Sequence, residues 1–380
     1  MNKWLAIDER KSIVAGQRLI SLDAFRGLTV AGMILVNNPG SWSYVYPPLR
    51  HAEWHGWTPT DLIFPFFLFI VGVSMSLSFA RRAALGEAGG KTYLRIVRRS
   101  LLILGLGWFL HLFPYFRFST MRLPGVLPRI ALCFFFGSLI YLSLTVKERA
   151  AAVIIGLAVY WLAMKLVPVP GYGAGILEYR GNLCGYIDFQ LLAGHLYRPE
   201  FDPEGLLSTL PAVATTLLGT LAGDWLRSKR SMFEKTAWQL AGGIALTGAG
   251  LALQPFFPIN KQLWSPTYVL FTAGLAAIVL AFCYVLVDGM GIKRWAAPFL
   301  VFGTNAIVAF AGSTLMVKVL ALIKVSAGGR SLGLQPFVYQ ELVSPWAGKE
   351  LGSLLVAVGY VLLWMALMTP LYRKRVFIKL

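Results

Sequence analysis

Long apolar runs separated by short polar segments extend along almost the whole chain. A helix needs roughly 20 mostly apolar residues to cross the hydrocarbon of a bilayer, and it satisfies its own backbone groups where no water is available. About ten runs reach this length. They lie near residues 19–38, 59–80, 100–117, 126–145, 150–167, 207–226, 236–253, 267–287, 297–324 and 350–371. The pattern predicts an all-α, polytopic integral membrane helical bundle with about ten transmembrane helices, formed as one domain over residues 1–380.

Composition supports a membrane protein and explains the charge. Of the residues, 57% are hydrophobic and 14% are charged, and the mean hydropathy is +0.65, which exceeds what a soluble domain of this size could bury. The net charge of +18 would suggest a nucleic-acid partner in a soluble protein. Here most Lys and Arg residues lie in alternate segments, beginning with Lys3, Arg10, Lys11 and Arg18 before the first run. The positive-inside rule then predicts that both termini are cytoplasmic, and no nucleic-acid partner is expected.

The segments on the opposite, outer side have a different composition. Residues 39–58 and the long periplasmic loop of residues 168–206 are rich in aromatic residues, Gly and Pro. Three of the four histidines, His51, His55 and His195, lie on this side. Because functional residues concentrate in loops held by a rigid scaffold, we expect the chemistry to face outward. Asp8 and Glu9 and the absence of a small-residue cleavage site argue against a removable signal peptide.

The segment LRHAEWHGWTPTDLIFPF brings four titratable groups, His51, Glu53, His55 and Asp61, to the start of an apolar run. Two histidines four residues apart superficially resemble a zinc-binding helix, but Glu53 does not directly follow the first His as the metalloprotease pattern requires, and Gly56 and Pro59 disfavour a continuous helix. The three cysteines also lack a paired metal spacing, so no metal is expected. A neutral imidazole oriented by a carboxylate can instead accept a proton. The alternative is that these are ordinary interfacial residues, with Asp61 stabilising a helix N-terminus.

Polar residues also interrupt the apolar runs themselves. Asn37 ends the first run in LVNNPGSW, where its amide can either donate to a carbonyl oxygen that becomes negative or simply terminate the helix in a turn. Asp23 and Arg26 lie three residues apart in the first run, and Arg129 lies near the outer end of the fourth. Charged groups in lipid are costly, so these should face the bundle or a wet cavity, or pair with each other.

Five stretches together resemble the bacterial branch of the heparan-α-glucosaminide N-acetyltransferase family. They are RLISLDAFRGLTVAGMILVNN, HAEWHGWTPTDLIFPFFLFIVG, LPRIALCFFF, DPEGLLSTLPA and PINKQLWSPTYVL. The resemblance implies a transmembrane acyltransferase domain that moves an acetyl group from cytosolic acetyl-CoA to the amine of a glucosamine on the far side of a bacterial inner membrane. Lysosomal members have an additional luminal domain and a preceding helix, for which we expect no room in this chain, so the resemblance concerns the transmembrane core.

The resemblance also implies catalytic residues. By position, the essential histidine of the family matches His51, the asparagine that closes the preceding helix matches Asn37, and the acidic residue of the following segment matches Asp61. His51 would remove a proton from the amine, oriented by Asp61, while Asn37 would stabilise the thioester oxygen. In a second route, His51 would first accept the acetyl group as an acyl-imidazole; direct transfer in a ternary complex is the route we favour.

Binding residues follow from the same scheme. Acetyl-CoA is the expected co-substrate, with Arg26 and Arg129 as its expected contacts and the basic loop of residues 81–99 beside the phosphates, although basic loop residues also follow from topology. Trp54, Glu53 and Asp188 are the expected contacts of an amino sugar; the alternative for the tryptophan is an interfacial belt.

Two other functions remain open on the sequence. One is a membrane O-acyltransferase that modifies a hydroxyl of a surface polysaccharide or lipid, and the other is a non-catalytic amino-sugar transporter whose intramembrane polar residues line a pathway. The small residues of AGGIALTGAG could bring helices close together, so a homo-oligomer is also open.

Overall fold

The computed structural model describes residues 19–86, 89–327 and 330–378, and within them regular structure is helical apart from one hairpin. The longer helices are α1 (Ile20–Asn37), α2 (Ile63–Ala84), α3 (Gly90–Leu112), α4 (Val126–Ser143), α5 (Val146–Leu166), α6 (Leu183–Leu192), α7 (Thr209–Arg227), α8 (Met232–Ala252), α9 (Pro266–Cys283), α11 (Ala306–Leu322) and α14 (Lys349–Arg373). The short helices are α10 (Ala297–Gly303), α12 (Leu334–Phe337), α13 (Ser344–Ala347), the 3-10 turns η1 (Pro47–Leu49), η2 (Pro59–Leu62) and η3 (Phe118–Thr120), and the π-helical segments η4 (Tyr284–Gly289) and η5 (Val338–Val343). Strands β1 (Lys324–Ala327) and β2 (Arg330–Gly333) pair antiparallel, with Lys324 opposite Gly333.

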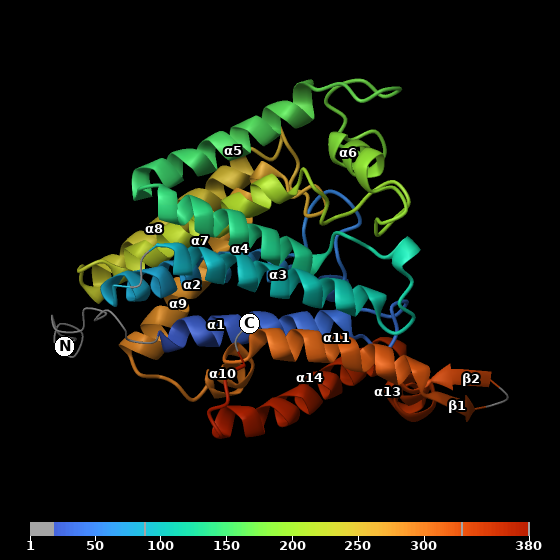
Figure 1. Ribbon diagram of the computed structural model, residues 1–380. Coiled ribbons are helices and arrows are strands. Elements are labelled where there is room, and N and C mark those ends of the chain that lie inside the picture. The colour runs from blue at the N-terminus through green and yellow to red at the C-terminus, as the bar shows by residue number, and fades with distance from the viewer. Residues whose placement is uncertain (1–18, 87–88, 328–329, 379–380) are drawn as a thin grey trace.

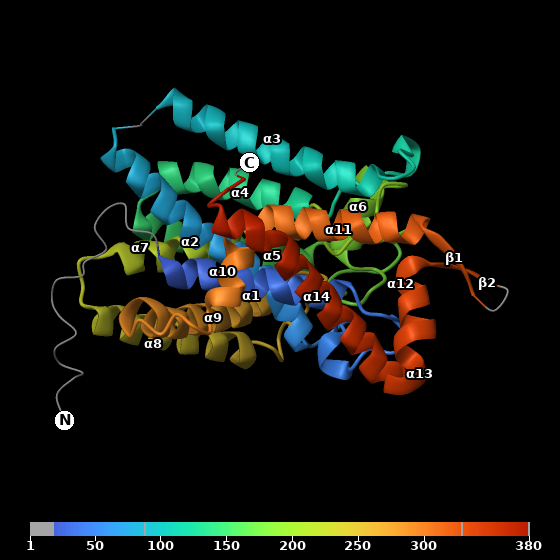
Figure 2. The same cartoon turned by 90° about the horizontal axis from the view of Figure 1, so that it is seen from below.

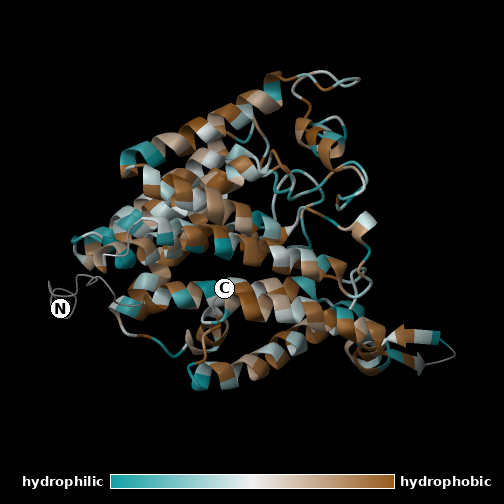
Figure 3. Cartoon of the chain, viewed as in Figure 1, coloured by the Kyte–Doolittle hydropathy of each residue, from teal (hydrophilic) through white to brown (hydrophobic). Residues whose placement is uncertain are grey.

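The long helices lie side by side along a common direction (Figure 1). The loops after α1, α3, α5 and α8, together with α6 and the hairpin, gather at one end of the bundle, which we call the His51 end (Figure 1). Seen from below, α14 crosses beneath α1 and α10, and α3 lies at the edge beside α4 (Figure 2). Apolar residues colour most of the helix lengths, whereas hydrophilic residues concentrate in the loops and helix ends (Figure 3). The arrangement is that of a helical membrane bundle.

The prediction of an all-helical, multi-pass membrane protein is confirmed, whereas the count of about ten spans is not. Each predicted run coincides with a helix, but within the described residues six helices are long and apolar enough to cross a membrane, or seven if α10 and α11 form one bent span. The placement of both termini on the cytoplasmic side stays a prediction. Lys3, Arg10, Lys11 and Arg18, on which it partly rests, lie outside the described residues.

Two predicted spans differ from the helices found. The third begins earlier, at Gly90, because Thr92, Ile96, Ser100 and Ile103 form a buried stripe at helical spacing beneath basic residues. It ends at Leu112 because the residue before Pro114 is extended. The ninth is broken between α10 and α11 by a bend of 81°. At this break the side chain of Asn305 bonds the backbone of Val376 and Ile378, which ties the bend to the segment after α14.

Helices α2 and α7 approach each other at two glycines. A Cβ added at Gly72 would lie 1.9 Å from the Thr216 carbonyl oxygen, and one at Gly219 would lie 2.1 Å from the Phe69 oxygen. Such distances are far below contact distance, so only glycine allows this separation, as is common where membrane helices pack closely. Because α2 continues from the turn that contains Asp61, this contact also fixes the position of that turn.

Replacing Gly219 with valine is therefore expected to lower the free energy of unfolding by about 1–3 kcal/mol, because the side chain must push α7 away from α2. The measurement is the thermal unfolding midpoint of the purified protein in detergent. Gly242→Val on α8 is the matched control, since a Cβ there meets nothing within 4 Å. Equal midpoints for the two variants would contradict the close packing.

Candidate active site at the His51 end

The segment before α2 bends at residues 53–55 and folds around the Asp61 carboxylate, which accepts the N–H groups of both Ala52 and Thr58. His51, Glu53, His55 and Trp57 are exposed, whereas the residues between them are partly covered. The backbone N–H of Gly56 donates to the Ile259 carbonyl at 2.8 Å. Gly56 has a φ of 95°, a conformation that side chains rarely adopt. The segment is therefore fixed against the loop that precedes α9.

Asp61 lies in the first turn before α2 and is 1% exposed. It forms a capping box with Thr58: the Thr58 N–H donates to Asp61 Oδ2 at 3.0 Å. The same oxygen accepts the Ala52 N–H at 3.0 Å. The other oxygen, Oδ1, lies 2.7 Å from His51 Nδ1. The carboxylate thus organises the turn and holds the imidazole at once, as expected from the sequence.

The contact between Asp61 and His51 defines the tautomer of the imidazole. An ionised carboxylate only accepts hydrogen bonds, so Nδ1 must carry the hydrogen that it donates to Asp61. In the neutral ring the second nitrogen, Nε2, then has its lone pair available. The His51 side chain is 49% exposed. The arrangement can accept a proton from a molecule that approaches the His51 end.

Lys261 completes the cluster and was not anticipated from the sequence. Its Nζ lies 2.9 Å from His51 Nδ1 and 3.2 Å from Asp61 Oδ1. Burial lowers the pKa of Lys261, while the negative charges of Asp61 and Glu204 oppose this change. No role could be assigned to Lys261 from the sequence, because 210 positions separate it from His51 and no local pattern marks such a contact.

His55 is oriented differently from His51. Its Nε2 lies 3.4 Å from Glu178 Oε1, and its Nδ1 lies 3.3 Å from the Asn260 amide nitrogen. His55 therefore connects the long loop of residues 168–206 to the loop before α9. Among the described residues, no group of three or more His, Cys, Asp or Glu side chains is placed to hold a metal ion.

Asn37 is the last residue of α1 and is exposed. Its neighbour Asn38 is buried, and the amide of Asn38 donates to the Ile34 carbonyl at 2.6 Å, which ends the helix. The helix-ending role considered for Asn37 is therefore carried out by its neighbour Asn38. A role of Asn37 toward a substrate oxygen stays a prediction.

The three expected sugar contacts differ in accessibility. Glu53 is exposed, and its backbone carbonyl accepts the Gln262 amide at 2.8 Å. Trp54 is half-buried: its indole N–H donates to the Leu177 carbonyl at 2.9 Å, and its ring packs against Tyr179 and Phe201. Trp57, 42% exposed, presents more of its ring than Trp54 does.

Asp188 is fully buried on α6. Its Oδ1 accepts the Leu206 N–H at 2.8 Å, and the carboxyl packs against Gly205. Burial raises the pKa of Asp188 to about 7, so part of the population is uncharged at neutral pH. In this structure Asp188 supports the loop that leads into α7, and a direct contact with a sugar stays a prediction.

The two arginines expected to contact CoA lie at different depths. Arg26 on α1 bonds Asp23 at 3.0 Å, the Gly303 carbonyl at 3.2 Å and Ser74 at 2.7 Å. It therefore connects α1, α2 and α10. Arg129 is buried near the His51 end, where its Nη2 donates to the Gly205 carbonyl at 3.0 Å and to Ser208. Within the described residues its Nε and Nη1 have no hydrogen-bond partner.

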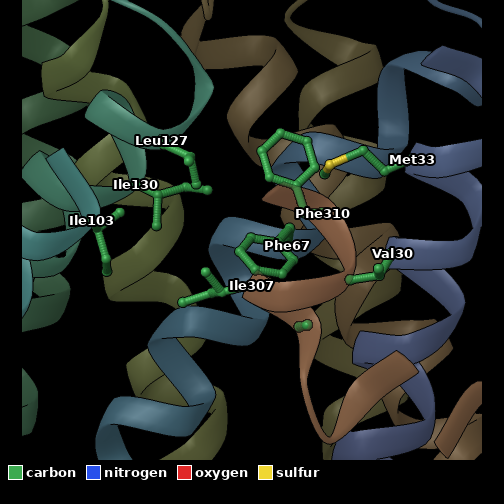
Figure 4. A pocket seen from close by; sticks show the side chains of 9 residues that line it. Val30, Met33, Phe67, Ile103, Leu127, Ile130, Ile307 and Phe310 are labelled. Carbon is green, nitrogen blue, oxygen red and sulfur yellow. The ribbon is translucent and has the colours of Figure 1, made fainter. Parts of the chain in front are cut away.

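An apolar cavity lies between α1, α2, α3, α4 and α11. Its volume is only about 20 Å³, and it is lined by Val30, Met33, Phe67, Ile103, Leu127, Ile130, Ala306, Ile307 and Phe310. In Figure 4, Phe67, Ile307 and Phe310 point into the space between Val30 and Met33 on one side and Ile103, Leu127 and Ile130 on the other. The cavity shares a face of α1 with two polar residues, because positions 26, 30, 33 and 37 follow helical spacing. This face is basic at one end, apolar in the middle and polar at the His51 end.

Comparison with known proteins identifies the family of this chain. The model of the catalytic region of heparan-alpha-glucosaminide N-acetyltransferase matches residues 18–252, which include Arg26, Asn37, His51 and Asp61. The chain belongs to this family. The human and mouse heparan-alpha-glucosaminide N-acetyltransferases are each 29% identical to it over 96% of its length. The chain spans 60% and 61% of the length of these two relatives. Membership in this acetyltransferase family confirms the resemblance found in the sequence.

Proposed function

We propose that this chain transfers an acetyl group from cytosolic acetyl-CoA to the amine of a glucosamine-type sugar at the periplasmic face of a bacterial inner membrane. The observation that supports this most strongly is the half-exposed imidazole of His51, 2.7 Å from the buried carboxylate of Asp61. A general base needs a free lone pair and a partner that fixes its orientation, and this pair supplies both.

We take the acceptor to be an amine because the human and mouse relatives are named N-acetyltransferases. An amino sugar is mostly protonated at neutral pH, so its ammonium group first loses one proton to solvent, and the neutral nitrogen loses a second proton as it bonds to the thioester carbon. His51 Nε2 takes this second proton. The exposed carboxylate of Glu53 on the same segment and that of Glu178 nearby attract the cationic sugar. The exposed ring of Trp57 provides an apolar surface for the C–H face of the sugar.

The donor reaches His51 along α1 from the opposite end of the bundle. From Arg26 to Asn37 the helix rises about 16 Å, which suits an extended pantetheine arm. Arg99 is close enough to both Arg26 and Arg82 for their charges to interact, so three arginines lie near the start of this path. Their guanidinium groups are suited to bind the CoA phosphates. The arm would run past Val30 and Met33, where the small apolar cavity must widen to admit it.

Asn37 closes the path at the outer end. An exposed amide at the end of α1 can donate a hydrogen bond to the thioester oxygen as negative charge develops on it. Transfer is direct: the amine nitrogen forms the new bond to the acetyl carbon, the carbon–sulfur bond breaks, and the proton on His51 passes to the departing thiolate.

Transfer across a sealed membrane tests the function. Purified protein is reconstituted into liposomes that contain acetyl-labelled acetyl-CoA, and glucosamine is added outside. Labelled N-acetylglucosamine is expected outside the vesicles. Glucose, which has the hydroxyls but not the amine, is the matched acceptor control and is expected to stay unlabelled.

The other outcomes identify the alternative functions. Label on glucose, or on hydroxyls only, would indicate an O-acyltransferase. Entry of unmodified glucosamine into the vesicles without acetylation would indicate a transporter. Either result would overturn the proposed function.

A further inference from the structure

The loop before α9 is built to hold Lys261 in place. The Asn260 side chain accepts the Leu263 N–H at 2.8 Å, and the Asn260 N–H donates to Ser265 Oγ at 3.0 Å. Trp264 adopts a φ of 52° with its ring buried. The loop contacts the His51 segment on both sides of Lys261, through the Ile259 carbonyl to Gly56 and through Gln262 to Glu53. Such rigid support for one lysine indicates a specific role for its ammonium group.

The donors and acceptors around Lys261 Nζ determine which hydrogen bonds its ammonium group can form. An ammonium group has only donors, and the hydrogen on His51 Nδ1 is already directed at Asp61. Lys261 Nζ therefore bonds Asp61 Oδ1 at 3.2 Å. Its separation of 2.9 Å from Nδ1 places a positive charge beside the ring without a hydrogen bond between them. The group lies on the Nδ1 edge of the imidazole and not on the Nε2 edge, where the reacting atoms meet.

We propose that Lys261 is a positioning residue that keeps His51 neutral and its Nε2 available. It acts through the ring and through Asp61. An imidazolium at His51 would add a second positive charge 2.9 Å from the ammonium group, so the neutral ring is favoured whenever Lys261 is charged.

The consequence for acetyl transfer rests on the proposed function. His51 Nε2 takes a proton from the amine as the carbon–nitrogen bond forms, and the carbon–sulfur bond breaks to release a thiolate. The imidazolium then has Lys261 as a repelling neighbour, so it readily gives the proton to the thiolate sulfur. The histidine returns to its neutral form, and the products are the amide and the free thiol.

The other charges around the ring do not replace this effect. Asp61 from the turn before α2 favours the imidazolium, and Glu204 from the loop before α7 lies within electrostatic range of Lys261 and stabilises its charge. Glu53 on the segment of His51 itself is exposed to solvent. Among these groups Lys261 supplies the positive charge that contacts the ring.

Carbethoxylation by diethyl pyrocarbonate tests whether Lys261 keeps His51 neutral. It does not require acetyl transfer, since the reagent reacts with neutral imidazole. Modification of His51 is followed by mass spectrometry against pH, with fragment ions separating His51 from His55. In Lys261→Met the pH profile is expected to move upward by about one pH unit, so that modification below the midpoint slows about tenfold. Lys261→Arg keeps the charge and is expected to keep the wild-type profile.

Lys349→Met is the matched control, because this lysine lies over the Tyr44 ring, away from His51. An unchanged or downward-shifted profile in Lys261→Met would overturn the proposal. If that variant does not fold, Lys261→Gln removes the charge, keeps a polar side chain and carries the same test. Absence of acetyl transfer in the wild type would refute the proposed function but leave this measurement valid. Where transfer occurs, the acid side of the pH profile of kcat/KM is expected to shift upward by the same amount in Lys261→Met, with KM for acetyl-CoA unchanged.

Discussion

His51→Ala is expected to lower kcat for acetyl transfer by at least about 100-fold, which is the usual contribution of a general base. The variant has no base for the proton that the attacking nitrogen must lose, and it gives the departing thiolate no proton. KM for acetyl-CoA is expected to change little, because the donor path along α1 does not include the His51 side chain. The measurement is the steady-state rate with glucosamine and labelled acetyl-CoA, together with the thermal midpoint of each protein.

His55→Gln is the control for His51→Ala. Both histidines are exposed on the same segment, but the contacts of His55 are with Asn260 and Glu178 and not with Asp61. We expect this variant to keep at least about half of the wild-type rate, because His55 lacks the carboxylate partner that orients a general base. Turnover in His51→Ala equal to that of the wild type would remove His51 from the mechanism.

His51→Ala also distinguishes direct transfer from transfer through an acyl-imidazole. Incubation with acetyl-labelled acetyl-CoA in the absence of an acceptor should leave the protein unlabelled if transfer is direct. Label that is retained by the wild type and absent from His51→Ala would instead indicate an acyl-imidazole at His51.

Local patterns in the sequence carry most of the information on the helices. Each predicted apolar run corresponds to a helix, since a stretch of apolar residues in lipid has few other stable forms. The pairing of His51 with Asp61 was also predictable, because both lie within one short segment and Thr58 with Asp61 has the spacing of a capping box. The boundaries of α3 and the bend before α11 were missed because they depend on an amphipathic stripe and on Asn305, which apolarity alone does not reveal.

The remaining parts of the site depend on contacts between distant segments. Lys261 comes to His51 because the loop before α9 is bonded to Gly56, and a single sequence contains no signal for that contact. Trp54 is more covered than Trp57 because its indole N–H bonds Leu177 and its ring packs against Tyr179 and Phe201, which lie far away in the sequence. Asp188 is buried because α6 folds back onto the loop at Gly205. The sequence predicted a loop over residues 168–206, and a loop has no regular period from which the burial of a side chain such as Asp188 could be predicted.

Asp61→Asn is expected to be as damaging as loss of the histidine, with kcat lower by about 100- to 10,000-fold. The amide that replaces the carboxylate can donate to His51 Nδ1, which would move the ring hydrogen to Nε2. That tautomer has no lone pair at the reacting nitrogen. The variant also removes the negative charge that Lys261 contacts at 3.2 Å, so the ammonium group would lose its counterion.

The shape of the side chain is almost unchanged in Asp61→Asn, which separates chemistry from folding. Its amide oxygen can still accept from the Thr58 and Ala52 N–H groups, as the carboxylate does. We therefore expect a thermal midpoint close to that of the wild type alongside the loss of rate. Glu350→Gln is the matched control, because Glu350 is an exposed carboxylate in the first turn of α14. It should leave the rate and the thermal midpoint unchanged. If Asp61→Asn kept the rate while losing stability, Asp61 would serve only as a helix cap, and the proton acceptor at His51 would need no partner.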